Sequence, residues 1–330
     1  MNEHVPEPAK LLLPGDSRAA VGLEHAVRAA AACRLPVLVQ GESGSGKEGV
    51  ARAIHAWSPR RSGPFVAINC AALGDTLLEA ELFGAKRGAY TGCDRDRPGL
   101  LHQAHDGTLL LDEVGEMSPS LQGKLLRFLD GGGFRPVGGS SETRCDVRIV
   151  AATHRDLRRA ARTGQFRGDL WWRLAVVRIR VPALRERTGD LATIVEALRP
   201  RLEAECARSP LQLTERALEN LARQRWPGNL RELRGVLARA LLASGGGPLD
   251  VDAFALEVPA VDDTESGGLE SRMIRDALET STGNIGRAAA SIGWTRQKLY
   301  RRMVALGIRS RQSLSRGTEP TTSSASSTFQ

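Results

Sequence analysis

The chain has 330 residues, enough for one large hydrophobic core and a smaller second domain. Hydrophobic residues make up 41% and charged residues 25%, an ordinary globular composition, and no apolar run approaches the roughly 20 residues of a membrane span. We therefore expect a cytoplasmic protein with no membrane partner. The formal charge of +8 permits a nucleic-acid partner without establishing one, and the five scattered cysteines favour reduced thiols over a disulfide framework.

Residues 1–10 are polar and proline-containing, so we expect a disordered lead with no signal peptide and no sensory domain. Strand-like and helical stretches then alternate over residues 11–182. The pattern predicts an α/β core with a mostly parallel sheet. The strands are expected at Val37–Val39, Phe65–Ile68, Thr108–Leu111, Val147–Ala152 and Val176–Ile179.

A glycine-rich turn follows the first strand, and the residues after it have helical spacing. It reads Gly41, Glu42, Ser43, Gly44, Ser45, Gly46, Lys47 and Glu48. Glycines let backbone N–H groups converge on a phosphate at a helix N-terminus, and Lys47 would reach the β- and γ-phosphates. A tight turn without a ligand also fits these eight residues, because Glu48 stands where such loops usually have Ser or Thr.

The strand at Thr108–Leu111 ends in two adjacent carboxylates, Asp112 and Glu113. A buried parallel strand delivers them to the sheet edge at which ligands bind. There Asp112 can hold Mg²⁺, and Glu113 can polarise an attacking water. A strand followed by an acidic turn is the alternative, but it does not account for both motifs in this order.

The pattern becomes purely helical over residues 183–245, which predicts a helical lid beside the core. Residues 246–268 carry Gly, Pro and several acids and are expected to form a linker. A helix-turn-helix domain is expected at 269–309, followed by a disordered tail at 310–330. Its first helix should turn Met273, Ile274, Ala277 and Leu278 inward. Asn284 can cap its second helix, which should run to Ile292.

The third helix of this domain carries clustered cations, which favours DNA over a solvated helical appendage. Thr295 can cap it. Arg296, Gln297 and Lys298 are the candidate base readers, and Arg301 and Arg302 the candidate phosphate contacts.

Together these motifs resemble the bacterial sigma-54-dependent transcriptional activators, which are AAA+ ATPases with a Fis-type DNA-binding domain. The resemblance runs from about residue 12 to residue 308 and makes Glu48 a normal member of the phosphate-binding loop. The most specific match is the stretch 81–93, which resembles the loop that contacts sigma-54. Its tip is Gly88, Ala89, Tyr90, Thr91, Gly92 and Cys93, with Tyr90 in place of the usual Phe and Cys93 in place of the usual Ala.

The resemblance also assigns single residues around the nucleotide. Asn69 matches the switch asparagine that restrains the water-activating glutamate, although a turn asparagine is the plainer interpretation. Thr153 stands at the sensor I position after its strand, and His154 stands where the family usually has Asn. Arg167 and Arg173 resemble arginine fingers that act on a neighbouring subunit's site. Arg231 resembles the sensor II residue that reaches from the lid.

The resemblance implies an ATPase that uses ATP and Mg²⁺ and assembles as a ring, with a hexamer as the expected form. It would bind enhancer DNA and remodel the sigma-54 RNA polymerase holoenzyme from the closed to the open complex. A DNA-bound regulator that uses nucleotide only for assembly is the second hypothesis, and a generic AAA+ remodeller the third. Control would come from expression level or from a separate regulatory protein.

Overall fold

The computed structural model describes residues 13–90, 93–208, 211–244 and 247–250, and within the C-terminal region 273–274, 276–278, 280–281, 285–292, 294 and 299. The chain divides into two units, Met1–Val258 and Pro259–Gln330, and each is described by itself. Among the described residues, no helix is both long enough and apolar enough to cross a membrane.

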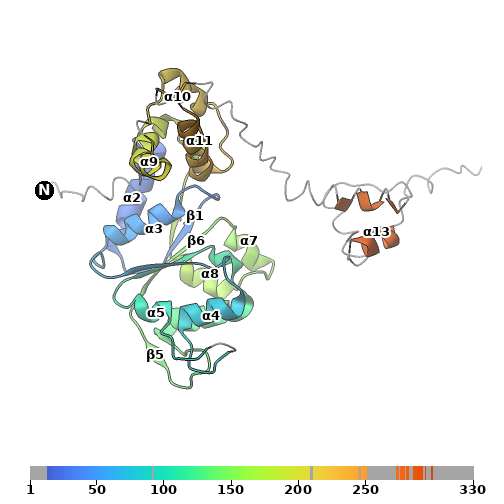
Figure 1. Cartoon of the computed structure of the whole chain (residues 1–330). Coiled ribbons are helices and arrows are strands. Elements are labelled where there is room, and N and C mark those ends of the chain that lie inside the picture. Colours follow the sequence, from blue (N-terminus) through green and yellow to red (C-terminus); the bar gives the residue numbers. More distant parts are fainter. Residues whose placement is uncertain are drawn as a thin grey trace, which may run out of the picture. The chain divides into compact units, whose positions relative to one another are not determined.

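The first unit is built on a five-stranded parallel sheet (Figure 1). Its strand order is β2-β3-β6-β1-β7. All five predicted strands are confirmed, because parallel strands covered on both faces read as continuous apolar runs. Their bounds are β1 Val37–Gln40, β2 Phe65–Asn69, β3 Thr108–Asp112, β6 Arg148–Thr153 and β7 Val177–Arg180.

Helices cover both faces of this sheet, and alternate strand residues supply two separate apolar cores. On one face, Val39 and Val150 pack in a cluster with residues of the first two helices, whereas on the other Leu109 and Ile149 pack with residues of the later helices. The first two are α2 (Arg18–Ala32) and α3 (Lys47–Ala56); the later ones are α4 (Asp75–Phe83), α5 (Leu100–Gln103), α6 (Pro119–Gly131), α7 (Leu157–Arg162) and α8 (Gly168–Leu174).

The central strands end together at one edge of the sheet. In the parallel register Gln40 lies beside Thr153, and Asn69 lies beside Asp112. The loop after β1, the acidic pair after β3 and the residues after β6 are therefore neighbours. This is the edge at which ligands bind in open α/β folds.

The predicted lid is a helical bundle of α9 (Leu191–Cys206), α10 (Glu215–Ala222) and α11 (Asn229–Ala243), which two 3₁₀ turns, η2 (Leu184–Glu186) and η3 (Thr188–Asp190), join to the core. Trp226 is buried in it and donates its indole N–H to the Leu221 carbonyl at 2.8 Å.

The predicted start of the linker at residue 246 is wrong by several residues. Leu249 is buried in the lid cluster and exchanges backbone hydrogen bonds with Gln212 and Thr214, so the lid extends at least to Asp250.

Two insertions lie at the other side of the core from the lid (Figure 1). One is the stretch 84–99, which contains the predicted contact loop; the other is a hairpin of β4 (Gly133–Phe134) and β5 (Thr143–Arg144). Ala85 forms an antiparallel bridge with Arg97 and a parallel bridge with Val137, so the hairpin loop is bonded to the base of the contact loop.

The second unit contains α13 (Ile285–Ser291), inside the range predicted for the second helix of the DNA-binding domain. Ile274, Ala277 and Leu278 are buried in a small apolar cluster, as predicted. Met273 is 39% exposed, so its predicted inward position is wrong. The six predicted DNA-contacting residues, from Thr295 to Arg302, lie outside the described residues.

Candidate active site

The loop after β1 has the conformation that a phosphate-binding loop needs. Gly44 and Gly46 have positive φ angles of 73° and 100°, and Gly46 leads into α3 without a side-chain cap. The first N–H groups of α3 therefore remain available to an anion. The Ser45 hydroxyl is buried and has no hydrogen-bond partner within the described residues. An unsatisfied hydroxyl at a positively polarised helix end fits a phosphate group.

Lys47 is the charged residue of this loop and is only 6% exposed. Its Nζ donates to the carbonyls of Gly41 at 3.1 Å and Glu42 at 3.3 Å. The same atom lies 3.2 Å from Glu113 Oε1. A buried ammonium held by exchangeable partners can turn to a phosphate without a new desolvation cost.

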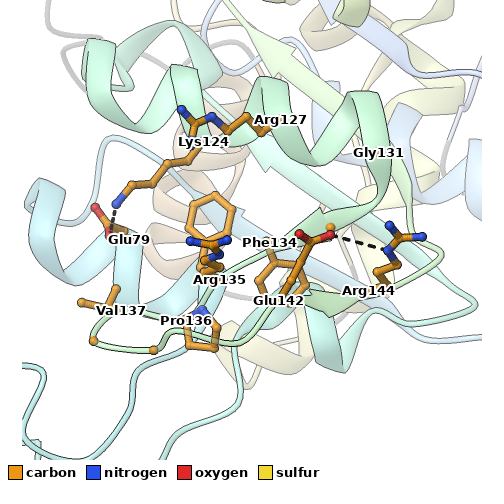
Figure 2. A pocket seen from close by; sticks show the side chains of 14 residues that line it. Glu79, Lys124, Arg127, Gly131, Phe134, Arg135, Pro136, Val137, Glu142 and Arg144 are labelled. Carbon is orange, nitrogen blue, oxygen red and sulfur yellow. Dashed lines mark hydrogen bonds and ion pairs between the residues drawn. The ribbon is translucent and has the colours of Figure 1, made fainter.

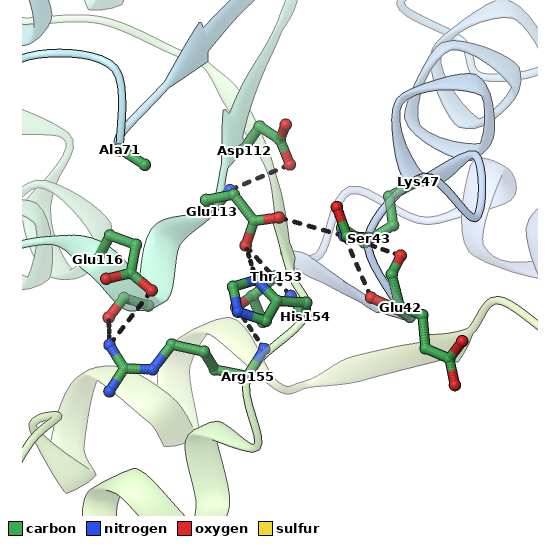
Figure 3. A network of polar contacts seen from close by, with 12 residues as sticks. Glu42, Ser43, Lys47, Ala71, Asp112, Glu113, Glu116, Thr153, His154 and Arg155 are labelled. Atoms are coloured by element: carbon green, nitrogen blue, oxygen red, sulfur yellow. Dashed lines mark hydrogen bonds and ion pairs between the residues drawn. The ribbon is translucent and has the colours of Figure 1, made fainter. Parts of the chain in front are cut away.

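Glu113 is the residue directly after β3 and has a positive φ of 52°. Its second oxygen accepts from His154 Nδ1 at 2.7 Å and from the His154 backbone N–H at 3.2 Å (Figure 3). Burial alone would raise the pKa of Glu113, but the His154 hydrogen bonds and the Lys47 charge outweigh it and lower that pKa. Glu113 is therefore ionised and able to accept a proton.

Asp112 lies beside it at the end of β3 and accepts the Glu113 N–H at 3.0 Å. Burial and the neighbouring Glu113 charge raise the pKa of Asp112, so a cation there would favour its ionised form. Among the described residues no cluster of three or more His, Cys, Asp or Glu could hold a metal. A cation at Asp112 would need further oxygen ligands from a bound phosphate, as Mg²⁺ commonly has.

Three further predicted residues, Thr153, Asn69 and Glu48, have these positions, and one correction concerns Thr153. Thr153 is the last residue of β6 rather than the residue after it, and its buried hydroxyl accepts the Arg155 N–H at 3.0 Å. The side chain of Asn69 accepts the Ala71 N–H at 2.8 Å, as in a turn, and the described residues show no bond from it to Glu113. His154, whose role the sequence did not predict, is hydrogen-bonded to the Glu113 carboxylate. Glu48 pairs with Arg52 on the exposed side of α3.

The lid touches the phosphate-binding loop directly. The Leu230 N–H donates to the Gly44 carbonyl at 3.0 Å, and the predicted lid residue Arg231 donates to the Ser43 hydroxyl at 2.9 Å. A side chain at Gly44 would place its Cβ 2.3 Å from the Gly228 carbonyl oxygen. This glycine is therefore required by the lid as well as by its backbone conformation.

Glu42 is the second link between the loop and the lid region. It forms an ion pair with Arg185, with one contact of 2.7 Å, and accepts from Asn229 Nδ2 at 3.2 Å. The Arg185 hydrogen bond, together with Asn229, lowers the pKa of Glu42 to about 2 despite partial burial. Asn229 is fully buried and also donates to the Ser43 carbonyl and accepts the Leu184 N–H. Sequence reasoning missed Arg185 and Asn229; the available signal for Asn229 was an amide residue directly after Pro227-Gly228, at the start of a helical pattern.

Arg167 and Arg173 lie away from their own chain's loop. Arg167 pairs with Asp169 at 2.7 Å and Arg173 with Asp130 at 2.6 Å, and all four side chains are about half exposed. The structure thus brings neither arginine to the Lys47–Glu113 site of the same chain.

The base of the predicted contact loop is well packed. Cys93 is 3% exposed, its thiol donates to the Lys86 carbonyl at 3.2 Å, and its carbonyl accepts the Gly88 N–H at 2.8 Å. Ala89 and Tyr90 are partly buried against the same small cluster. The cysteine therefore fits this loop in place of the usual alanine, while Thr91 and Gly92 lie outside the described residues.

Three family descriptions match the chain in succession. Residues 13–180 match the Sigma-54 interaction domain, 185–268 the AAA+ ATPase lid domain, and 268–306 the Fis family of bacterial regulatory proteins. The chain belongs to the sigma-54-dependent transcriptional activators. This activator accordingly has an AAA+ ATPase-type core with a nucleotide site and a DNA-binding helix-turn-helix domain.

Its relatives include the Nif-specific regulatory protein of Azotobacter vinelandii, 43% identical over 87% of this chain and 57% of the relative, and PilR of Pseudomonas aeruginosa, 39% identical over 93% and 72%. The chain spans about three fifths of the first curated relatives it matches. The solved structure of Brucella abortus NtrX in complex with ATP is 33% identical, with a TM-score of 0.67 over 89% of this chain and 69% of that one.

Proposed function

We propose that this activator hydrolyses ATP at the contact between neighbouring copies of the chain and uses the energy to convert the sigma-54 RNA polymerase closed complex to the open complex. The observation that supports the proposal best is the pairing of Lys47 with Glu113 at 3.2 Å beside an uncapped helix N-terminus. A phosphate-binding cation and a carboxylate base thus converge on one site.

ATP is the substrate in this mechanism. The α3 N–H groups and the Ser45 hydroxyl would hold its phosphates, and Lys47 would turn from Glu113 to them. Glu113 would then accept a proton from the attacking water. Asp112 is the residue that would hold Mg²⁺, which supplies charge neutralisation on the phosphates when bound. Positioning and electrostatics carry such a reaction, with little covalent chemistry by the protein.

Arg167 and Arg173 complete the site from a neighbouring copy in this proposal. Their ion pairs with Asp169 and Asp130 are exposed, and exposed pairs are weak enough to be exchanged for a phosphoryl group. The assembly would be a ring, with six copies as the expected number. Hydrolysis would move the loop Gly88–Cys93 against sigma-54, while Thr295–Arg302 would hold the ring on enhancer DNA.

Open-complex formation at a sigma-54 promoter tests the proposal, with Lys47→Ala and Thr91→Ala compared with the wild type. Lys47→Ala should lose both ATP hydrolysis and activation. Thr91→Ala should hydrolyse ATP at the wild-type rate and fail to activate. Normal activation by Thr91→Ala would reject the assignment of the contact loop.

A regulator that uses nucleotide only for assembly is the second candidate, favoured only by the placement of Glu113 against Lys47 and His154 in this structure. Sustained ATP turnover by assembled rings would exclude it.

We also propose control by a separate protein that binds the AAA+ surface. Recovery of polymerase and sigma factor alone in pull-downs from cells would argue against that control.

A further inference from the structure

A small cavity of about 190 Å³ lies at the edge of the sheet opposite the nucleotide site, where the parallel strands begin. Its volume equals that of about six water molecules, which suits a small ligand rather than a nucleotide. The segments that lead into β1, β2, β3 and β6 all contribute to its lining, with Cys33, Arg34, Arg60, Asp106, Asp146 and Arg148.

A larger cavity of about 530 Å³ lies beside α4, α6 and the β4–β5 hairpin (Figure 2). It adjoins the predicted contact loop, because Val137 of its lining is bridged to Ala85. Two of its cations, Lys124 and Arg144, are already paired with carboxylates of the same cavity. The small cavity differs, because its most buried cation has no carboxylate partner.

Arg148 is this cation, and it is only 3% exposed. Its two terminal nitrogens donate to the carbonyls of Ala30 and Ala31 at the C-terminal end of α2, but its Nε has no hydrogen-bond partner in the described part of the chain. A buried guanidinium with an unsatisfied N–H and no counter-charge is costly. The unpartnered Ser45 hydroxyl marks the phosphate-binding loop in the same way.

Two further arginines line the small cavity. Arg34 is exposed and makes no hydrogen bond or ion pair with any described residue. Arg60 pairs with Asp146 at 2.6 Å through a terminal nitrogen. Burial lowers the pKa of Arg148, and the charge of Arg60 acts in the same direction. An anion among the three guanidinium groups relieves this repulsion, and donors from three different segments suit a tetrahedral oxyanion.

The carboxylates of Asp106 and Asp146 line the cavity beside the arginines and restrict which oxyanion fits. A carboxylate repels an anion without a proton, but it accepts a hydrogen bond from an anion that carries an O–H. Inorganic phosphate keeps such a proton at neutral pH, whereas sulfate and the phosphodiesters of nucleic acids do not. Donors and acceptors together therefore favour inorganic phosphate.

We propose that this cavity is a binding site for inorganic phosphate, which the three arginines hold while its O–H donates to one of the two carboxylates. Phosphate bound there ties the segment before β1 to the segments before β2 and β6, and so stabilises this edge of the sheet. The inference does not depend on the proposed function, because the cavity shares no lining residue with the nucleotide site.

Cys33 provides a local probe, because it lines the cavity and is partly exposed. Its rate of alkylation by iodoacetamide in the full chain is measured by peptide mass spectrometry at pH 7.5, with phosphate or sulfate at equal ionic strength. At about tenfold excess over its dissociation constant, phosphate should slow this rate by more than about fivefold and sulfate by less than about twofold. Cys206, the other partly exposed cysteine, ends lid helix α9 and should react equally in both salts.

Three variants locate the effect. Arg34→Gln removes a cation that has no partner in the described fold, so the chain should fold normally and lose most of the protection of Cys33. Arg216→Gln makes the same change at an exposed position of α10, outside the cavity lining, and should be protected as the wild type is. Lys47→Ala, which weakens any phosphate binding in the nucleotide site, should also keep the protection.

The melting temperature gives a second measurement. Phosphate at the same excess should raise it by about 3 °C in Lys47→Ala and leave it unchanged in Lys47→Ala/Arg34→Gln, whereas sulfate should raise neither. Equal shifts in the two proteins would overturn the inference.

The other outcomes are equally decisive. Equal protection of Cys33 by phosphate and sulfate would show an adventitious ion only, and loss of protection in Lys47→Ala would assign the effect to the nucleotide site. Either result overturns the inference, as does an alkylation rate that phosphate leaves unchanged. Glycerol 3-phosphate is mostly without a phosphate proton at pH 7.5 and should protect as poorly as sulfate. Stronger protection by this ester than by phosphate would overturn the assignment to the inorganic ion.

Discussion

Both oxygens of Glu113 are occupied in this structure, one by Lys47 and the other by His154. Hydrogen bonds to a carboxylate lower its basicity, and a weaker base removes a proton from water less readily. The arrangement is therefore a resting one. Lys47 would be drawn away by phosphates, whereas His154 has no such competitor, so we propose that it restrains the carboxylate where Asn69 was expected to.

Replacing His154 tests this restraint. His154→Ala should raise the basal kcat for ATP by about threefold, because the pKa of Glu113 rises when a donor is removed. KM for ATP should stay near the wild-type value, since His154 makes no contact with the phosphate-binding loop. His154→Asn, which restores the usual family residue, serves as the matched control, and steady-state ATPase kinetics give both constants. A tenfold fall in kcat for His154→Ala would instead show that the imidazole holds Glu113 in its productive position.

At the scale of elements, the contact between the phosphate-binding loop and α11 depends on buried polar groups. Asn229 satisfies the Leu184 N–H and the Ser43 carbonyl at once. Asn229→Ala would leave these groups unsatisfied, at a cost of about 1–3 kcal/mol. We expect a lower urea midpoint and weaker ATP binding, measured by chemical denaturation and titration calorimetry. Arg231→Ala removes only one exposed bond and should weaken ATP binding with little change in the midpoint.

The Glu42 contact should be sensitive to acid. The pKa of Glu42 is about 2 in the folded chain, below the ordinary 4.5. Its ion pair with Arg185 therefore stabilises the fold fully above pH 4.5, and this contribution is lost as the pH falls towards 2. Because its side chain is 44% exposed, solvent screening reduces the size of the effect. The difference in unfolding free energy between wild type and Glu42→Gln should therefore be constant from pH 7 to pH 5 and shrink below pH 4.5. A difference that grows in acid would contradict the ion pair as its cause.

The strands of the core could be predicted because their burial on both faces leaves uninterrupted apolar runs in the sequence. The loop and the acidic pair could be placed at one sheet edge for the same reason. Contacts such as Glu42–Arg185 and Glu42–Asn229 could not be predicted from the sequence. They join residues 143 and 187 positions apart, and they depend on how the lid docks on the core. Leu249 was misplaced because a glycine-rich stretch before it resembled a linker, whereas its backbone pairs with the lid.

At the scale of the whole first unit, a buried network ties the start of α2 to the start of the lid. Asp190 is 2% exposed, accepts the Ser17 N–H at 2.7 Å and the Ser17 hydroxyl at 2.6 Å, and pairs with buried Arg187 at 3.1 Å. Arg187 in turn donates to the Pro14 carbonyl. The lid is therefore held to the core here as well as at the phosphate-binding loop.

Asp190→Ala should be among the most destabilising single changes in this unit. It leaves the Arg187 charge buried without its carboxylate, which costs about 3–5 kcal/mol. Thermal and urea unfolding would measure the loss. Glu205→Ala, which removes exposed ion pairs with Arg201 and Arg234, is the control and should leave the melting temperature almost unchanged. Equal effects of the two variants would show that the Asp190 network contributes nothing beyond a surface pair.

The closeness of Gly44 to the Gly228 carbonyl has a practical meaning for protein engineering. Exchanging this phosphate-binding loop for that of another protein would also change the contact with the lid, because Gly44 lies directly against Gly228 and Leu230. An alanine at position 44 would place its Cβ against the Gly228 carbonyl oxygen, so a chimera that carried it could not keep the contact between this loop and the start of α11.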